Sequence, residues 1–208
     1  MIRELDLNIV KTPKKFEPSS LIGDVGRIPK SAIKPHHLVP SCGPVSNQIK
    51  DGFERFHTGG WKFARVDFNN KYKLINSIPI LRETLELLGK PLARQNLNGI
   101  NEILSWIEAP LTRCRILILE AGHKINPHVG NGRQEELVRL LIPLQTHPDV
   151  IHYAGSSSSH LGAGEVWYLN QRRKHWVENN SDVDRYLLAV DTLPNPWIKE
   201  LILNGEKY

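Results

Sequence analysis

The sequence is poor in the features that staple small secreted domains or anchor a chain in a membrane. Only two of its 208 residues are cysteines, Cys42 and Cys114, and no Cys-x-x-Cys spacing occurs. Neither a disulfide framework nor a thiolate zinc site is therefore expected. The first residues carry charges where a signal peptide needs an apolar segment, and no apolar run reaches the roughly 18 residues of a membrane-spanning helix. We therefore expect a cytoplasmic protein in a reducing compartment, without a membrane partner.

The sequence also lacks a concentrated charge of either sign. It has 27 Lys and Arg residues against 22 Asp and Glu residues, a net charge of +5, and its densest basic run is Arg172-Arg173-Lys174. A scattered positive excess favours small anionic partners such as carboxylates, sulfates or phosphates. No basic stripe with interleaved aromatic residues is visible, so nucleic acid is not expected as a partner.

The first half of the chain contains isolated helix and strand patterns. The length fits one domain. Apolar residues alternate around Leu5, Leu7 and Ile9 and again over 61–68, which predicts a strand at each place. The proline-rich stretch between them is interpreted as an irregular arm or connector. A four-residue apolar spacing indicates a short helix within 43–57, and apolar faces predict helices over 77–89 and 99–108.

From Thr112 onward the apolar residues alternate or form short continuous runs. Six strands are predicted, separated by glycine and asparagine turns, at 115–120, 137–145, 149–153, 165–169, 175–178 and 185–190. Short strands at this spacing are typical of a sandwich or barrel. The four serines 156–159 are interpreted as a turn. The expected organisation is a single domain over 1–208, with an arm and bracing helices (1–110), a β core (111–192) and a C-terminal extension (193–208).

Nine histidines make a metal site worth testing. Side chains two residues apart on a strand share a face, so a histidine and a ligand at the second following position can both point into a barrel. With a distant histidine they form the two-histidine-one-carboxylate set of non-haem iron(II) sites. Here His128 is followed at that position by Gly130, and the candidate distant ligand is His175. His123 and His160 remain competing candidates, whereas the other histidines are interpreted as ordinary: His36, His37, His57, His147 and His152.

The stretch 115–191 resembles the aspartyl/asparaginyl β-hydroxylase family of iron(II)/2-oxoglutarate oxygenases. Four motifs occur in the family's order. They are Ala121-Gly122-His-Lys-Ile-Asn-Pro127-His128, Arg139-x-x-Ile-Pro-Leu-x-Thr146, Gly164-Glu-x-Trp167, and His175-x-Val-x-Asn179 with Arg185 and Asp191. The resemblance implies a mainly β fold with N-terminal helices and a double-stranded β-helix (jelly-roll, cupin-like) core.

The resemblance also implies roles for individual residues. His128 and His175 would bind Fe(II), and Arg185 would bind the distal carboxylate of 2-oxoglutarate. Arg139 would contact the co-substrate or a substrate carboxylate, since a guanidinium forms a bidentate pair with a carboxylate. Pocket residues are expected among the apolar and aromatic neighbours of these positions, namely Leu141, Trp167 and Trp176.

Two residues depart from the family pattern. Most members have aspartate where this chain has Gly130, and histidine where it has Leu141. Some hydroxylases of this family have glycine at the first position, and so do iron/2-oxoglutarate halogenases, in which chloride occupies the open coordination position. The glycine also fits a site that has lost turnover or an engineered substitution. Replacement of the carboxylate by Glu135 or Glu136 is disfavoured, because a facial set needs its carboxylate beside His128.

These observations predict an oxygenase that uses Fe(II), 2-oxoglutarate and O2. We expect hydroxylation of an unactivated C–H bond in a small substrate, an amino acid or related metabolite, with a peptide as the alternative. A halogenase using chloride is the second interpretation, and a non-catalytic jelly-roll that binds a ligand or metal is the third.

Overall fold

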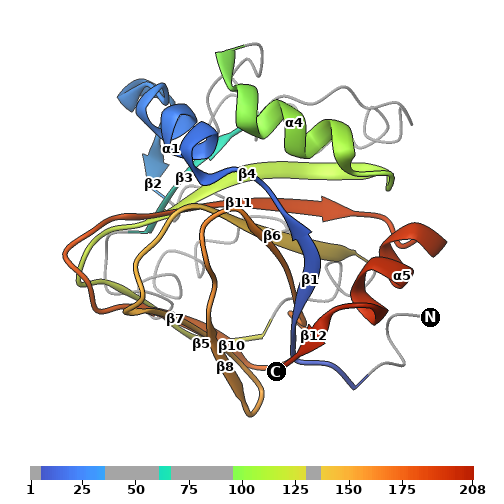
Figure 1. Ribbon diagram of the computed structural model, residues 1–208. Helices are drawn as coiled ribbons and strands as arrows, with labels where there is room; N and C mark the ends of the chain where they lie inside the picture. The colour runs from blue at the N-terminus through green and yellow to red at the C-terminus, as the bar shows by residue number, and fades with distance from the viewer. Residues whose placement is uncertain (1–5, 36–60, 67–95, 130–136) are drawn as a thin grey trace, which may run out of the picture.

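The computed structural model describes residues 6–35, 61–66, 96–129 and 137–208. Within these residues the strands form an eight-stranded sheet of order β12-β1-β9-β6-β11-β4-β3-β2 and a four-stranded sheet of order β5-β10-β7-β8. The two sheets face each other (Figure 1). The helices predicted within 43–57 and 77–89 lie outside the described residues.

The core strands pass back and forth between the two sheets along the chain, except that β7 and β8 follow each other within the smaller sheet. The larger sheet takes β4 (Leu111–Leu119), β6 (Val138–Gln145), β9 (Glu165–Leu169) and β11 (Arg185–Thr192). The smaller sheet takes β5 (Lys124–His128), β7 (Val150–Ala154), β8 (Ser157–His160) and β10 (His175–Asn179). All the pairings between these strands are antiparallel. This is the strand order of a double-stranded β-helix, so the predicted fold class is confirmed.

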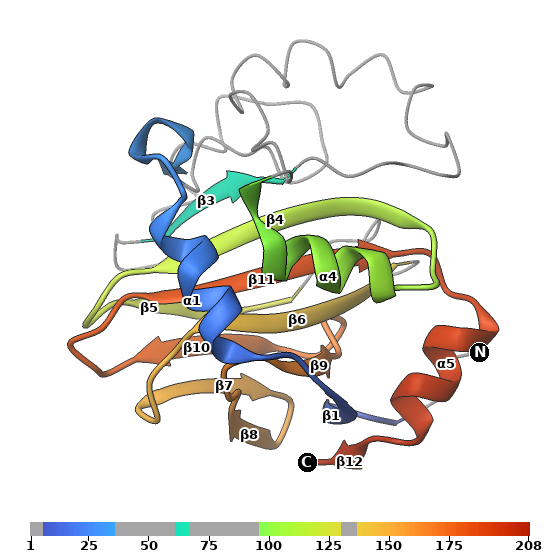
Figure 2. The same cartoon turned by 45° about the horizontal axis from the view of Figure 1, so that its top comes forward.

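Helices cover the outer face of the larger sheet. α1 (Pro18–Gly26) and α4 (Asn98–Trp106) lie across this face, and α5 (Pro196–Leu203) lies at its edge (Figure 2). Their apolar residues share one core with the outward side chains of the sheet, for example Leu21, Ile103 and Ile198 with Ile142 and Val190. The inner face of the larger sheet is thereby left to form a second core with the smaller sheet.

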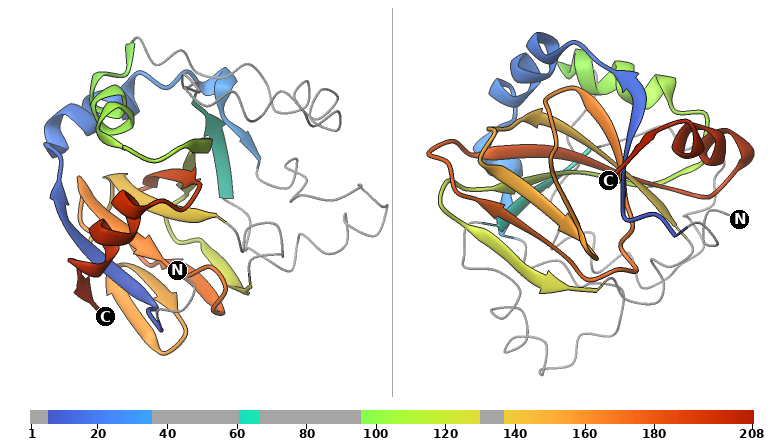
Figure 3. Two further views of the ribbon diagram at one scale, coloured as in Figure 1. Left: turned by 90° about the vertical axis from the view of Figure 1, so that its right-hand side faces the viewer. Right: turned by 60° about the horizontal axis from the view of Figure 1, so that its bottom comes forward.

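Segments outside the predicted core complete the larger sheet. β1 (Ile9–Lys15) pairs with β9 and with β12 (Glu206–Lys207), and β3 (Trp61–Arg65) joins β4 to β2 (Lys34–Pro35). Figure 3 shows β1 and the C-terminal segment side by side at one edge. Gly164, in the turn before β9, has a φ of 76°, and a Cβ there would lie 2.2 Å from the carbonyl oxygen of Phe16. This glycine of the third motif is thus required by the close passage of the N-terminal arm.

The strand predictions over the second half hold, with ends that shift by a few residues. The helix predicted at 99–108 corresponds to α4. The interpretation of the serines 156–159 as a turn holds for Ser156 but is wrong for the other three, which belong to β8 and pair with β7. The proline-rich arm contains the unpredicted helix α1. Pro18 occupies its first turn, where proline needs no hydrogen-bond partner, so proline starts this helix. A 3₁₀ turn, η2 (Lys30–Ala32), follows it.

In the described part of the chain no helix is long and apolar enough to cross a membrane.

The contact between α1 and α4 gives the first testable prediction. A Cβ on Gly99 would lie 2.7 Å from Leu21 Cδ2 and 3.2 Å from the backbone carbon of Ser20. Gly99→Ala should therefore lower the free energy of unfolding by about 1–3 kcal/mol through overpacking. Gly26→Ala is the matched control, because its Cβ would meet no atom within 4 Å. Urea unfolding of both variants measures the difference, and equal stabilities would contradict the packing argument.

Candidate active site

Two histidines meet between neighbouring strands of the smaller sheet. His128 ends β5, His175 begins β10, and the two residues are register partners with ring centroids 4.2 Å apart. The next inner pair is Ile125 with Val177, so β5 advances three residues where β10 advances two. The extra residue is a β-bulge, which re-aims the following side chain. It places both Ile125 and His128 on the inner face, which strict alternation would not allow.

Backbone carbonyl groups orient both imidazoles. Nδ1 of His128 lies 2.8 Å from the carbonyl oxygen of Asn126, and Nδ1 of His175 lies 2.9 Å from that of Arg173. A carbonyl only accepts, so each Nδ1 carries the proton and each Nε2 carries a lone pair. Burial, together with the neighbouring His128 and Arg139, lowers the pKa of His175 to about 4, and burial also lowers the pKa of His128. Both rings are therefore neutral near pH 7, as metal ligands must be.

The described residues do not supply a third protein ligand. Among them, no group of three His, Cys, Asp or Glu side chains could hold a metal ion. His123 and His160 instead contact the carbonyl oxygens of Ala121 and Val150 through Nδ1. Gly130, Glu135 and Glu136 lie outside the described residues, so the proposed open coordination position stays a prediction.

Arg185 begins β11 and points to the inner face of the larger sheet. It is 1% exposed, and burial lowers its pKa to about 9, so the guanidinium keeps its charge at neutral pH. In the described part of the chain, its Nε and Nη2 atoms have no hydrogen-bond partner. A buried guanidinium with unpaired donors is costly, which favours an anionic ligand at this point.

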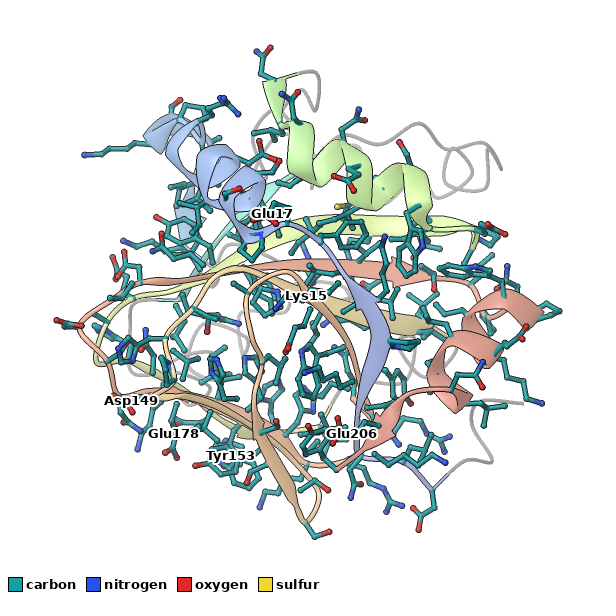
Figure 4. All side chains as sticks on the ribbon, in the orientation of Figure 1. Lys15, Glu17, Asp149, Tyr153, Glu178 and Glu206 are labelled. Atoms are coloured by element: carbon teal, nitrogen blue, oxygen red, sulfur yellow. The ribbon has the colours of Figure 1, made fainter. Side chains whose placement is uncertain are left out.

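Two of the three predicted pocket residues lie on the inner face. Leu141 and Trp167 belong to the apolar cluster between the sheets, which also contains Leu187. The prediction for Trp176 is wrong. This residue lies on the opposite face of β10 from His175, and its ring stacks on Tyr153 with centroids 4.5 Å apart. Figure 4 labels Tyr153 on the outer side of the smaller sheet. The alternation of side chains along a strand, which placed His175 inside, necessarily places its neighbour outside.

Arg139 also lies on the inner face, but its guanidinium already has a carboxylate partner within the protein. Its Nε and Nη2 donate to the two carboxylate oxygens of Asp191, the second over 2.9 Å, and Arg113 donates to the same group. Arg113 and Arg139 are the register partners of Asp191 on either side. Asp191 thus occupies the Nε–Nη2 edge of the guanidinium, and the predicted contact of Arg139 with a co-substrate or substrate carboxylate stays a prediction that would use the Nη1 end. Its charge lowers the pKa of both His128 and His175, so it lies near the pair.

Sequence reasoning missed His152. It occupies the inner face of β7, is 2% exposed, and pairs across the strands with Val177. Its pKa is well below the usual value, first because of burial and then because of the charge of Arg185. The available signal was the alternation Val150-x-His152-x-Ala154, which puts this histidine on the buried side of its strand.

A jelly-roll with two neutral histidines and a buried arginine between its sheets is suited to hold a metal ion beside an anionic ligand. The sequence signature of the aspartyl/asparaginyl β-hydroxylase family matches residues 81–194. The chain belongs to this family, whose members are iron(II)/2-oxoglutarate oxygenases.

Similar solved structures share the general architecture at low identity. A prolyl-4-hydroxylase from Pseudomonas putida has 14% identity and a TM-score of 0.47, with 91% of this chain and 94% of that chain covered. The non-heme monooxygenase ThoJ in complex with Ni has 13% identity and a TM-score of 0.43, with coverages of 90% and 74%. A predicted oxalate decarboxylase from Thermotoga maritima has 14% identity and a TM-score of 0.40, with coverages of 80% and 98%. Likeness at this level does not bear on the chemistry of this chain.

The residues present fit the iron and 2-oxoglutarate that the family implies. His128 and His175 are neutral, held by backbone carbonyl groups, and directed to one inner face. Arg185 offers buried, unpaired N–H groups for a carboxylate. The apolar cluster around Leu141, Trp167 and Leu187 excludes water and strengthens such a charge pair.

Proposed function

We propose that the protein is an iron(II)/2-oxoglutarate-dependent oxygenase that hydroxylates an unactivated C–H bond of a small substrate. The observation that carries the proposal is the register pairing of His128 with His175 on the face opposite buried Arg185. Two imidazole ligands belong to the facial set of non-haem iron(II) oxygenases, and an arginine can bind a carboxylate of the co-substrate; Gly130 stands at the position of the third, carboxylate ligand. The match of the family signature to 81–194 supports the same conclusion.

The roles of the chain's own residues follow from their positions. His128 and His175 would hold the metal through Nε2, and Arg185 would hold the distal carboxylate of 2-oxoglutarate. Iron, when bound with 2-oxoglutarate and O2, supplies the oxidising power that the side chains lack. Leu141, Trp167 and Leu187 keep water away from the reacting groups.

The substrate class proposed is an amino acid or related metabolite. The net charge of +5 favours an anionic small molecule over a cation. Arg139 adds a fixed positive charge close to the histidine pair, held in place by Asp191. A peptide carrying an acidic group is the alternative that the same charges permit.

Anaerobic reconstitution with Fe(II) and 2-oxoglutarate tests the proposal. We expect a metal-to-ligand charge-transfer band in the visible, which His175→Ala should abolish. On admission of O2 with a panel of amino acids, succinate and a hydroxylated product should form. A wild-type protein that gives neither the band nor succinate with any candidate would instead support the non-catalytic jelly-roll.

Halogenation is the second candidate, favoured by one feature of the sequence. Gly130 stands where most family members have an aspartate, and it has no side chain to occupy that coordination position. If chloride binds there, adding chloride should shift the charge-transfer band and yield a chlorinated product. Gly130→Asp should then abolish chlorination, whereas oxygenated product that forms without chloride rejects this candidate.

A further inference from the structure

His152 lies one step deeper between the sheets than the histidine pair. On β10, His175 is the register partner of His128 and of Ala154, and Val177 is the partner of His152. His175 and Val177 are two residues apart on the same face, a separation of roughly 6.6 Å along the strand. The His152 side chain is therefore near the metal-binding pair without being part of it.

Arg185 lies at the same depth on the facing sheet. Val150 shares an apolar cluster with Leu119, the register partner of Arg185. Ala154 shares the other inner cluster with Leu187, which lies two residues beyond Arg185. His152 stands between Val150 and Ala154 on the inner face of β7, so these contacts bring its ring close to Arg185 across the two sheets.

Both side chains are buried, and Arg185 has donors that the protein does not use. Arg185 is 1% exposed and His152 is 2% exposed. Within the part of the chain that the structure describes, Nε and Nη2 of Arg185 are buried without a hydrogen-bond partner. The surrounding inner side chains are apolar, among them Leu119, Val177 and Leu187. Buried donors of this kind are normally satisfied, so a ligand that only accepts hydrogen bonds fits between them.

We propose that His152 and Arg185 form a two-residue clamp for one carboxylate of a small dicarboxylate, with the guanidinium supplying the charge and the imidazole a second N–H donor. The inference rests on the proposed function, because it assigns this carboxylate to the distal end of 2-oxoglutarate. The spacing is suitable. Four C–C bonds of about 1.5 Å each span about 5 Å in an extended chain, and the bonds to the metal and to the clamp extend this span to the step of roughly 6.6 Å between the histidine pair and His152. The carboxylate's two oxygens accept from both residues, and the guanidinium donors gain the partners that they lack.

The neutral state of His152 suits this role. Burial and then the charge of Arg185 hold its pKa well below the usual value, so the ring presents one N–H and no second positive charge. Two adjacent cations would repel each other in a site without ligand. A neutral donor beside a charged one avoids that repulsion and still binds the anion.

The test compares two ligands on the Fe(II) protein under anaerobic conditions. One is 2-oxoglutarate, and the other is 2-oxopentanoate, which has a methyl group in place of the distal carboxylate. Removing a hydrogen bond to a charged group should weaken 2-oxoglutarate binding about tenfold or more in His152→Leu. The affinity for 2-oxopentanoate should not change. His152→Gln keeps an N–H donor and should recover most of the loss. Isothermal titration calorimetry measures all the dissociation constants.

Controls separate failure of the clamp from failure of the proposed function. Arg185→Leu should lose 2-oxoglutarate selectively, and His147→Gln, in an exposed turn, should match the wild type. Suppose that Arg185→Leu behaves as expected but His152→Leu binds both ligands like the wild type, or loses both equally. The clamp is then rejected, while the proposed function stands. If the wild type does not prefer 2-oxoglutarate to 2-oxopentanoate, the proposed function fails and the clamp with it. If His152→Leu does not fold, the two affinities are compared in His152→Gln and His152→Asn. The clamp is then supported only if the asparagine variant loses more affinity for 2-oxoglutarate than the glutamine variant does, with the affinity for 2-oxopentanoate unchanged in both.

A second measurement does not depend on the metal. Glutarate carries both carboxylates and lacks the oxo group, so it probes the clamp in the metal-free protein. It should raise the melting temperature of the wild type and leave that of His152→Leu and Arg185→Leu unchanged. Equal stabilisation of the wild type and the His152 variant would overturn the assignment.

Discussion

Asp191→Asn should lower the free energy of unfolding at pH 7 by about 3–5 kcal/mol, since breaking one side of a buried ion pair leaves its charge uncompensated. Asp191 is 2% exposed and accepts from Arg139 and Arg113 on the two flanking strands. Asparagine keeps the shape but removes the negative charge between two guanidinium groups. Urea unfolding followed by far-UV circular dichroism measures the loss.

The same carboxylate makes the wild type sensitive to acid. Burial alone would raise the pKa of Asp191, but Arg139 and Arg113 outweigh it and hold that pKa well below the usual range. The stabilisation is therefore fully present above the unfolded pKa of about 3.9 and is lost as the pH falls below it, by up to about 1.4 kcal/mol per pH unit. The stability difference between the wild type and Asp191→Asn should shrink over the same pH range.

A surface ion pair provides the control for Asp191. Asp6 pairs with Arg173, but their side chains are 85% and 48% exposed. Asp6→Asn should change stability by less than about 1 kcal/mol, because solvent screens exposed pairs. An Asp191→Asn variant as stable as Asp6→Asn would show that the inner arginines do not depend on this carboxylate.

Asn179→Leu should destabilise the protein by about 3 kcal/mol, because several buried hydrogen bonds are lost together. The side chain is 1% exposed. Its Nδ2 donates to the carbonyl oxygens of Leu119, Glu120 and Val183, and its Oδ1 accepts from the backbone N–H and hydroxyl of Ser181. These bonds tie the turn between β10 and β11 to the end of β4. They therefore hold the connection between β10, which carries His175, and β11, which carries Arg185.

The neighbouring asparagine is the matched control for Asn179. Asn180 is exposed, and its backbone N–H donates to the carbonyl oxygen of Asp149. Asn180→Ala should stay within about 0.5 kcal/mol of the wild type in the same urea experiment. A similar small effect at Asn179 would mean that water replaces its side chain, and the connection between β10 and β11 would then be held only by the pairing of each strand within its own sheet.

Sequence patterns alone predicted the helices and strands that depend mainly on the residues within the element itself. The short apolar runs over β9 and β11 and the apolar face of α4 placed those elements nearly where they lie. Rules for single residue types also gave wrong predictions at two places. The prolines of the N-terminal arm suggested an irregular connector, yet Pro18 begins α1 because a helix's first turn leaves N–H groups unpaired in any case. The serines of β8 carry little strand preference and became a strand by pairing with β7.

The residues of the candidate site likewise fall into those that the sequence could predict and those that it could not. His128, His175 and Arg185 were identifiable because motif order and spacing are written in the sequence. The partner of Arg139, the outward direction of Trp176 and the inner position of His152 were not. Each depends on which residue lies across a strand or sheet boundary, and such neighbours are distant in sequence, as Asp191 is from Arg139. The sequence by itself determined a jelly-roll with two histidines and an arginine suited to iron and 2-oxoglutarate. Only the tertiary structure decided which charges are already paired and which buried donors are left for a ligand, because strand register and sheet packing bring those groups together.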